Sequence, residues 1–129
     1  MFTPEDFAHL QFLQGRWKGM GPGGQPFYEA YDFPDHKTLR SCRYDDVQFT
    51  APSDGSTVTL EDGEIVSRWG GFTWHATEVA PNEARFDPVE APSSFCWRRV
   101  SRSQVEVVQR WTDEAGQRQS YTVTLDRVG

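Results

Sequence analysis

The fold is decided by the stretch Gly15-Arg16-Trp17-Lys18-Gly19-Met20-Gly21-Pro22-Gly23-Gly24-Gln25-Pro26. Glycine at position 15 allows a preceding helix to end and a strand to begin. Trp17 is expected to be a core residue, large enough to close the floor of a small barrel. Gly19 and Gly21 have no side chain, which allows the strand to bend or another group to approach its backbone. The stretch therefore predicts a first strand over 16–21, followed by a glycine-rich loop.

A short helix is expected before this stretch. Thr3 is suited to cap it, Pro4 suits the first helical position, and Asp6 follows three residues after Thr3, as in a capping box. Large apolar residues recur at a spacing of three and form one stripe, which consists of Phe7, Leu10 and Leu13. Because so short a helix is stable only when it packs on something larger, we expect this stripe to face the rest of the fold.

The remainder of the chain is typical of short strands separated by turns. Asp62-Gly63 is a strong hairpin signal, because Asp-Gly suits a tight turn. The spacing leaves no room for helical crossovers, and an antiparallel meander of this length removes its edges by closing. We expect an all-β, antiparallel up-and-down β-barrel of about ten strands in a single domain over residues 1–129. After the first, the expected strands are 27–33, 38–47, 57–60, 64–69, 72–79, 84–87, 94–100, 104–111 and 117–127, with loops at 21–26 and 51–56.

The Gly-x-Trp at positions 15–17 resembles the start of the calycin superfamily, which contains the lipocalins and fatty-acid-binding proteins. The extended pattern Gly-x-Trp-Lys-Gly-x-Gly-x-Gly-Gly-x-Pro is most similar to the nitrobindin-like β-barrel family. This resemblance implies a barrel of ten antiparallel strands. It also implies that an arginine on the last strand packs across Trp17, and Arg127 stands at the matching place.

Several nitrobindin-like proteins hold a haem through a histidine on the penultimate or last strand. The resemblance places Ser120 near that position, so the family's ligand is replaced here. If haem binds, the iron would need Tyr121 or His75 as its ligand. The resemblance therefore supports the expected barrel fold more strongly than it supports a bound haem.

Composition excludes several classes of protein. The 129 residues carry a net charge of −6 and dispersed basic residues, which is unlike a nucleic-acid-binding surface. No apolar run is long enough for a membrane span, and the N-terminus does not resemble a signal peptide. Cys42 and Cys96 match no metal or redox spacing, which indicates free thiols and a cytoplasmic location. Neither a metal site nor a catalytic nucleophile motif is present.

Aromatic residues make up 14% of the chain, so a few large rings are expected to line or fill the barrel. Strand alternation places Arg68, Arg98 and Arg110 outside the barrel. An arginine that points inward would need an anion, either a ligand carboxylate or an inward acid such as Glu29, Glu78 or Glu106. The predicted ligand-binding residues are Trp74, His75, Phe95, Trp97, Trp111, Tyr121 and Arg43.

These patterns favour a protein that binds a small apolar or aromatic molecule, with haem and a fatty-acid-like compound as examples. One alternative is a small barrel enzyme that uses a cavity tyrosine, histidine or arginine as an acid or base, although the sequence identifies no catalytic residue. A further alternative is an interaction module with a filled core. A homodimer is compatible with each of these hypotheses.

Overall fold

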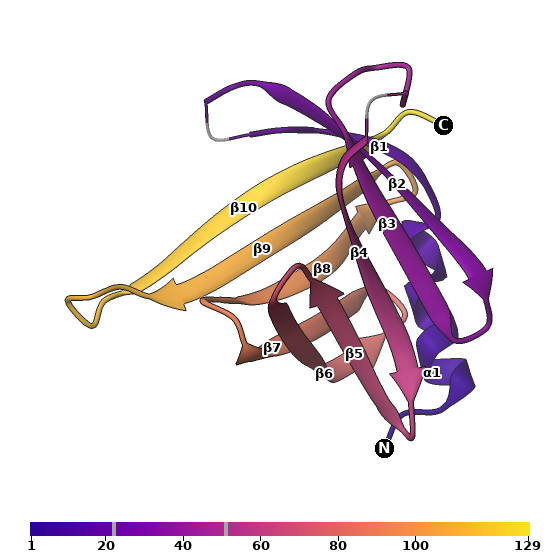
Figure 1. Ribbon diagram of the computed structural model, residues 1–129, viewed down its shortest axis with the longest axis vertical. Coiled ribbons are helices and arrows are strands. Elements are labelled where there is room, and N and C mark those ends of the chain that lie inside the picture. Colours follow the sequence, from indigo (N-terminus) through magenta and orange to yellow (C-terminus); the bar gives the residue numbers. More distant parts are fainter. Residues whose placement is uncertain (22, 51) are drawn as a thin grey trace.

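The computed structural model describes residues 1–21, 23–50 and 52–129, and in it ten antiparallel strands close into one barrel. Pro22 and Ala51, which the sequence analysis assigned to loops, lie outside the described residues. The strands follow one another around the barrel in chain order, and β10 closes the ring against β1 (Figure 1). The strands are β1 (Gly15–Met20), β2 (Pro26–Asp35), β3 (Thr38–Tyr44), β4 (Pro52–Glu61), β5 (Glu64–Trp69), β6 (Phe72–Ala80), β7 (Glu83–Glu90), β8 (Ser94–Ser101), β9 (Gln104–Thr112) and β10 (Arg118–Arg127).

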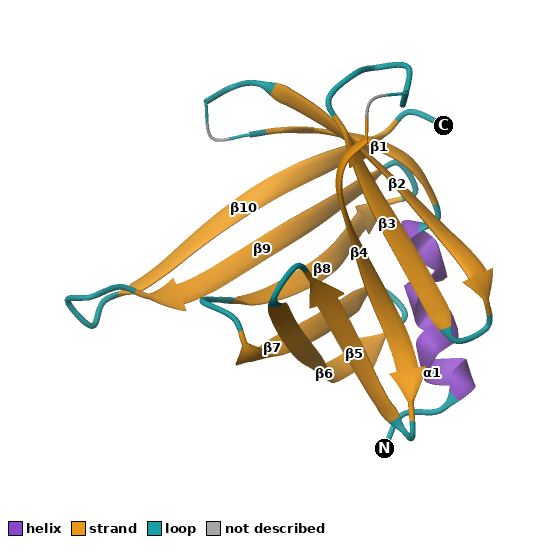
Figure 2. Ribbon diagram, viewed as in Figure 1, coloured by secondary structure: helices purple, strands orange, loops and turns teal. Residues whose placement is uncertain are grey.

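The helical segment begins as predicted and ends in a different form. Thr3 and Asp6 form the reciprocal capping box in front of α1 (Pro4–Ala8). The chain then tightens into the 3-10 helix η1 (His9–Leu13), because a segment this short has few intrahelical bonds to hold the α geometry. Figure 2 shows this segment in purple, beside one end of the barrel.

The apolar stripe of this segment closes the barrel floor. Phe7, Leu10 and Leu13 are almost completely buried. Phe7 meets Phe33 of β2 edge-on, with ring centroids 6.1 Å apart. Ahead of α1, Phe2 donates its backbone N–H to the carbonyl of Gly63, in the turn between β4 and β5. The helical segment is therefore attached to hairpins from different parts of the chain.

The predicted contact between Trp17 and Arg127 is present and joins the first strand to the last. The two residues face each other across the β1–β10 pair, and the guanidinium carbon lies 4.2 Å from the centre of the indole ring. The indole N–H donates to the Leu13 carbonyl at 2.8 Å. The Arg127 guanidinium donates to the carbonyls of Phe12 and Gln14. Helix, first strand and last strand are therefore held at one point.

Three strand boundaries differ from the predicted ones by three residues or more. β3 ends at Tyr44 rather than at residue 47, because the chain turns back and Phe49 packs on the rings of Tyr28 and Tyr44 outside the barrel. β4 begins at Pro52 rather than at 57, since residues 52–56 pair with β3 through their backbones despite their polar side chains. β7 extends to Glu90 rather than stopping at 87.

Two further expectations concern membrane-spanning segments and the state of the two cysteines. Among the described residues, no helix has the length and apolar character needed to cross a membrane. Both cysteines are free thiols, with Cys96 buried and Cys42 half-buried.

Candidate functional site

A cavity of about 490 Å³ lies inside the barrel, on the side opposite the helical floor. It opens where the β1–β2, β3–β4, β5–β6, β7–β8 and β9–β10 connections turn, and we call this end the mouth. Inward side chains of nearly every strand line it, because alternate residues of a closed barrel face the interior. Its aromatic lining residues are Phe27, Tyr31, Trp69, Phe72, Trp74, Phe95, Trp97 and Tyr121.

The rings form a continuous series from the mouth inward. Trp69 and Phe72 stand at the rim, with about two-fifths of each exposed, and their ring centroids are 5.7 Å apart. Phe72 contacts Trp74 at 6.1 Å, and Trp74 contacts Phe95 edge-on at 5.2 Å. Phe95 then meets Trp97 at 5.1 Å. A flat apolar molecule that enters at the rim would therefore meet ring surface along its whole path.

A polar group lies on the β2–β3 wall of the cavity. The Glu29 carboxylate accepts a hydrogen bond of 2.9 Å from the Tyr31 hydroxyl and pairs with the Arg43 guanidinium at 3.2 Å. Burial, and secondly the Glu29 charge, raise the pKa of Tyr31 well above its ordinary value. Arg43 also lies over the Phe27 ring at 4.2 Å. This group is satisfied internally, with each charged member already partnered.

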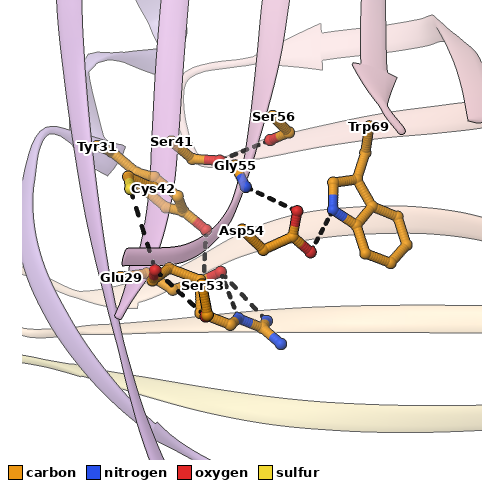
Figure 3. A network of polar contacts seen from close by, with 10 residues as sticks. Glu29, Tyr31, Ser41, Cys42, Ser53, Asp54, Gly55, Ser56 and Trp69 are labelled. Carbon is orange, nitrogen blue, oxygen red and sulfur yellow. Dashed lines mark hydrogen bonds and ion pairs between the residues drawn. The ribbon is translucent and has the colours of Figure 1, made fainter. Parts of the chain in front are cut away.

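A second carboxylate stands at the rim (Figure 3). Asp54 accepts hydrogen bonds from the Trp69 indole N–H and from the backbone N–H of Gly55. Deeper on the same wall, the hydroxyls of Ser41 and Ser56 are hydrogen-bonded to each other at 2.5 Å. Both donors to Asp54 are neutral, so its negative charge has no cationic partner among the ion pairs of the described residues.

The structure brings five of the seven predicted ligand-binding residues to the cavity. These are Trp74, Phe95, Trp97, Tyr121 and Arg43. His75 is exposed on the outer face of β6, between the inward residues Trp74 and Ala76. Trp111 is half-buried near the end of the β9–β10 hairpin and does not line the cavity. His75 and Trp111 therefore do not line the cavity, whereas the other five predicted residues do.

Strand alternation correctly predicts that three arginines lie outside the barrel. Arg68, Arg98 and Arg110 are exposed. Of the three proposed acids, only Glu29 lines the cavity. Glu78 and Glu106 form ion pairs with arginines of neighbouring strands, Arg85 and Arg98, on the outer surface.

Several lining residues were missed by sequence reasoning. Tyr31 shares its face of β2 with Glu29, and that alternation could have identified it. Trp69 and Phe72 flank Gly70-Gly71, which marks a tight turn with two large rings at its base. Asp54 carried no usable signal, because its segment is polar throughout and resembled a loop.

The lining residues fit a haem poorly. All three histidines of the chain lie outside the lining. Ser120, at the position suggested by the family resemblance, is exposed. Tyr31 is a weak candidate, because its raised pKa opposes formation of the tyrosinate that binds iron. Tyr121, half-buried in the cavity wall, is the remaining phenol.

An outer groove of about 760 Å³ runs over the outside of β2, β3 and β4. It is larger than the cavity but more open. Its wall includes Arg40 and Arg68, which are paired with Asp32 and Glu61. A shallow surface with paired charges encloses a small molecule less well than the ring-lined cavity does.

Comparisons with known proteins give a likeness of fold at low identity. No family model and no curated protein matches the chain. Two solved barrels resemble it over almost its whole length. One is a redesigned beta barrel, b11L5F_LGL, with 15% identity, coverage of 94% of this chain and 96% of that one, and a TM-score of 0.43. The other is EF1p2_mFAP2b, solved bound to DFHBI, with 16% identity, coverage of 95% and 98%, and a TM-score of 0.46.

Proposed function

We propose that this protein binds a small apolar or aromatic molecule in the barrel cavity. One observation carries the proposal: eight aromatic side chains line a cavity of about 490 Å³ that opens at the mouth. That volume lies within the usual range for small-molecule sites, about 300–1,000 Å³, and ligand sites are mostly apolar with a few placed polar groups. The same volume argues against an interaction module with a filled core.

A calycin-like barrel remains the fold family that we propose. The Gly-x-Trp stretch and the packing of Arg127 on Trp17 support it. We also retain a cytoplasmic location as part of the proposal, supported by the two free thiols. A nitrobindin-like haem function receives less support, because the histidine that would hold the metal is missing from the cavity lining.

An enzyme is the second candidate, favoured by the Glu29–Tyr31–Arg43 group. Convergent ionisable groups in a cavity are typical of acid–base sites. Here Tyr31 is held protonated at neutral pH and points at a carboxylate. A Tyr31→Phe variant that binds ligand normally but loses turnover would identify this second function.

The cavity is tested by filling it. Val123 lines the cavity, whereas its neighbour Thr124 is exposed on the other face of β10. We expect Val123→Trp to weaken binding of the neutral dye Nile red by about 10-fold or more, since a residue that fills a site removes the area the ligand buries. Thr124→Trp is the matched control and should bind as the parent does.

Two outcomes would overturn the proposal. One is equal binding by the Val123→Trp and Thr124→Trp variants, which would place the dye outside the cavity. The other is the absence of any saturable dye binding to the parent protein. If neither outcome is found, native mass spectrometry of protein from its own cells would identify the natural ligand by its mass.

A further inference from the structure

We infer that the ligand of this cavity carries a positive charge, as an amine or quaternary ammonium group on an aromatic or apolar body. The inference rests on the proposed function, and it names the chemical class of the ligand. Three observations carry it: the carboxylate at the rim that forms no described ion pair, the existing ion pair of Arg43, which is the one arginine among the described lining residues, and the aromatic rings beside both groups.

Asp54 supplies an anion where a ligand enters. Its two hydrogen-bond donors, the Trp69 indole and the Gly55 amide, are neutral (Figure 3). Arg43 lies opposite Asp54 on β3 but forms its ion pair with Glu29, so no described ion pair includes Asp54. A cation beside Asp54 would gain charge attraction, and a protonated amine would also donate a charge-assisted hydrogen bond to the carboxylate. A ligand carboxylate in the same place would be repelled.

Arg43 is poorly placed to receive an anionic ligand. Its guanidinium is paired with Glu29 and stacked on Phe27. A ligand carboxylate would have to share this guanidinium with Glu29, and two carboxylates on one cation repel each other. The charges of Glu29, Arg43 and Asp54 together leave the cavity lining with one net negative charge. This charge balance opposes the fatty-acid-like ligand considered from the sequence.

The rings at the rim provide the second half of a cation site. The face of an indole or phenyl ring carries a partial negative charge and attracts ammonium groups. Trp69 and Phe72 are adjacent at the rim, and Trp69 is bonded through its N–H edge to Asp54. That bond turns the indole edge toward the carboxylate, and about two-fifths of Trp69 remains exposed beside the Phe72 ring.

Three probes of one shape test the inference. They share a phenyl ring and differ in charge: 2-phenylethylammonium, neutral 2-phenylethanol and 3-phenylpropanoate. Binding is followed by tryptophan fluorescence, since Trp69, Trp74 and Trp97 line the cavity, and is checked by calorimetry. We expect the cation to bind about 10-fold more tightly than the anion at low salt, with the difference shrinking as ionic strength rises.

The Asp54→Asn variant locates the charge effect. We expect it to weaken binding of the cation by about 3- to 10-fold and to leave the neutral probe unchanged. Asp87→Asn is the matched control, because Asp87 is exposed on the outer face of β7 and the substitution makes the same change in net charge. Its affinities should equal those of the parent.

The outcomes separate this inference from the proposed function. If 2-phenylethanol binds and the cation is not preferred, or if Asp54→Asn and Asp87→Asn behave alike, the inference is overturned and the cavity function stands. If none of the three probes binds, the proposed function itself fails. Circular dichroism of each variant establishes that the barrel is folded.

Discussion

The floor and the mouth of this barrel are built in opposite ways. At the floor, the helical segment packs its apolar stripe against Trp17, and Arg127 ties the first and last strands to it. At the mouth, Trp69 and Phe72 remain partly exposed, and no described ion pair includes Asp54. Side chains are most completely buried at the closed end, so we expect that end to contribute most of the stability and the open end to tolerate groups that suit a ligand.

Replacement of Trp17 should have the largest effect. Trp17→Ala removes a fully buried indole and its hydrogen bond to the Leu13 carbonyl. We expect the free energy of unfolding to fall by about 3–5 kcal/mol, measured by urea denaturation with circular dichroism. Trp69→Ala at the mouth is the matched control and should cost about 1 kcal/mol or less. Equal losses would contradict the proposed division of stability between the two ends.

Arg127 should have a smaller effect on the same measurement. Arg127→Met retains a long side chain but removes the charge over Trp17 and the donors to the Phe12 and Gln14 carbonyls. We expect a loss of about 1–3 kcal/mol, from the cation–π contact and the hydrogen bonds together. The control Arg110→Met alters an exposed arginine of β9 and should stay within about 0.5 kcal/mol of the parent.

Tyr31 lies between the two ends, and the raised pKa of its phenol should have the smallest effect on stability, one that appears only at alkaline pH. Its pKa is raised in the folded barrel, so the folded state holds the phenol proton more tightly than the unfolded chain. The resulting stabilisation is complete below the ordinary tyrosine pKa of about 10 and is lost as pH rises above it.

A comparison of the parent with Tyr31→Phe isolates this contribution. The parent's free energy of unfolding should fall more steeply above pH 10 than that of the variant. Cys96, whose pKa burial raises to about 11, contributes the same alkaline decline to both proteins. Parallel pH profiles would show that the Tyr31 proton is held no more tightly in the barrel than in the unfolded chain.

The floor could be predicted because its signals are local. The start of the helix is indicated within four residues, by Thr3, Pro4 and Asp6. Its buried face is indicated by the apolar stripe of Phe7, Leu10 and Leu13. The change from α to 3-10 geometry after Ala8 was not predicted, because the apolar stripe continues through it and does not distinguish the two geometries.

The mouth was harder to predict because its residues come from segments distant in sequence. Asp54 lies in a polar segment that becomes a strand only by backbone pairing with β3. Trp111 has the inward alternation of its strand, but the β9–β10 hairpin extends beyond the other strands, which carries that ring away from the cavity (Figure 1). Alternation specifies which face of the strand a side chain occupies. Whether that part of the strand borders the cavity depends on how all the strands are arranged in the barrel.

The contact between Arg127 and the end of the helical segment spans most of the chain, because Arg127 and Gln14 are separated by 113 positions in the sequence. Contacts between residues so distant in sequence slow folding, because the entropy cost of closing a large loop precedes the stabilisation that the contact provides. The hairpins in between are local and can form earlier. The pairing of β1 with β10 is therefore expected to be the last step of folding. Before that step, the unpaired edges of β1 and β10 are exposed and can pair with other protein molecules.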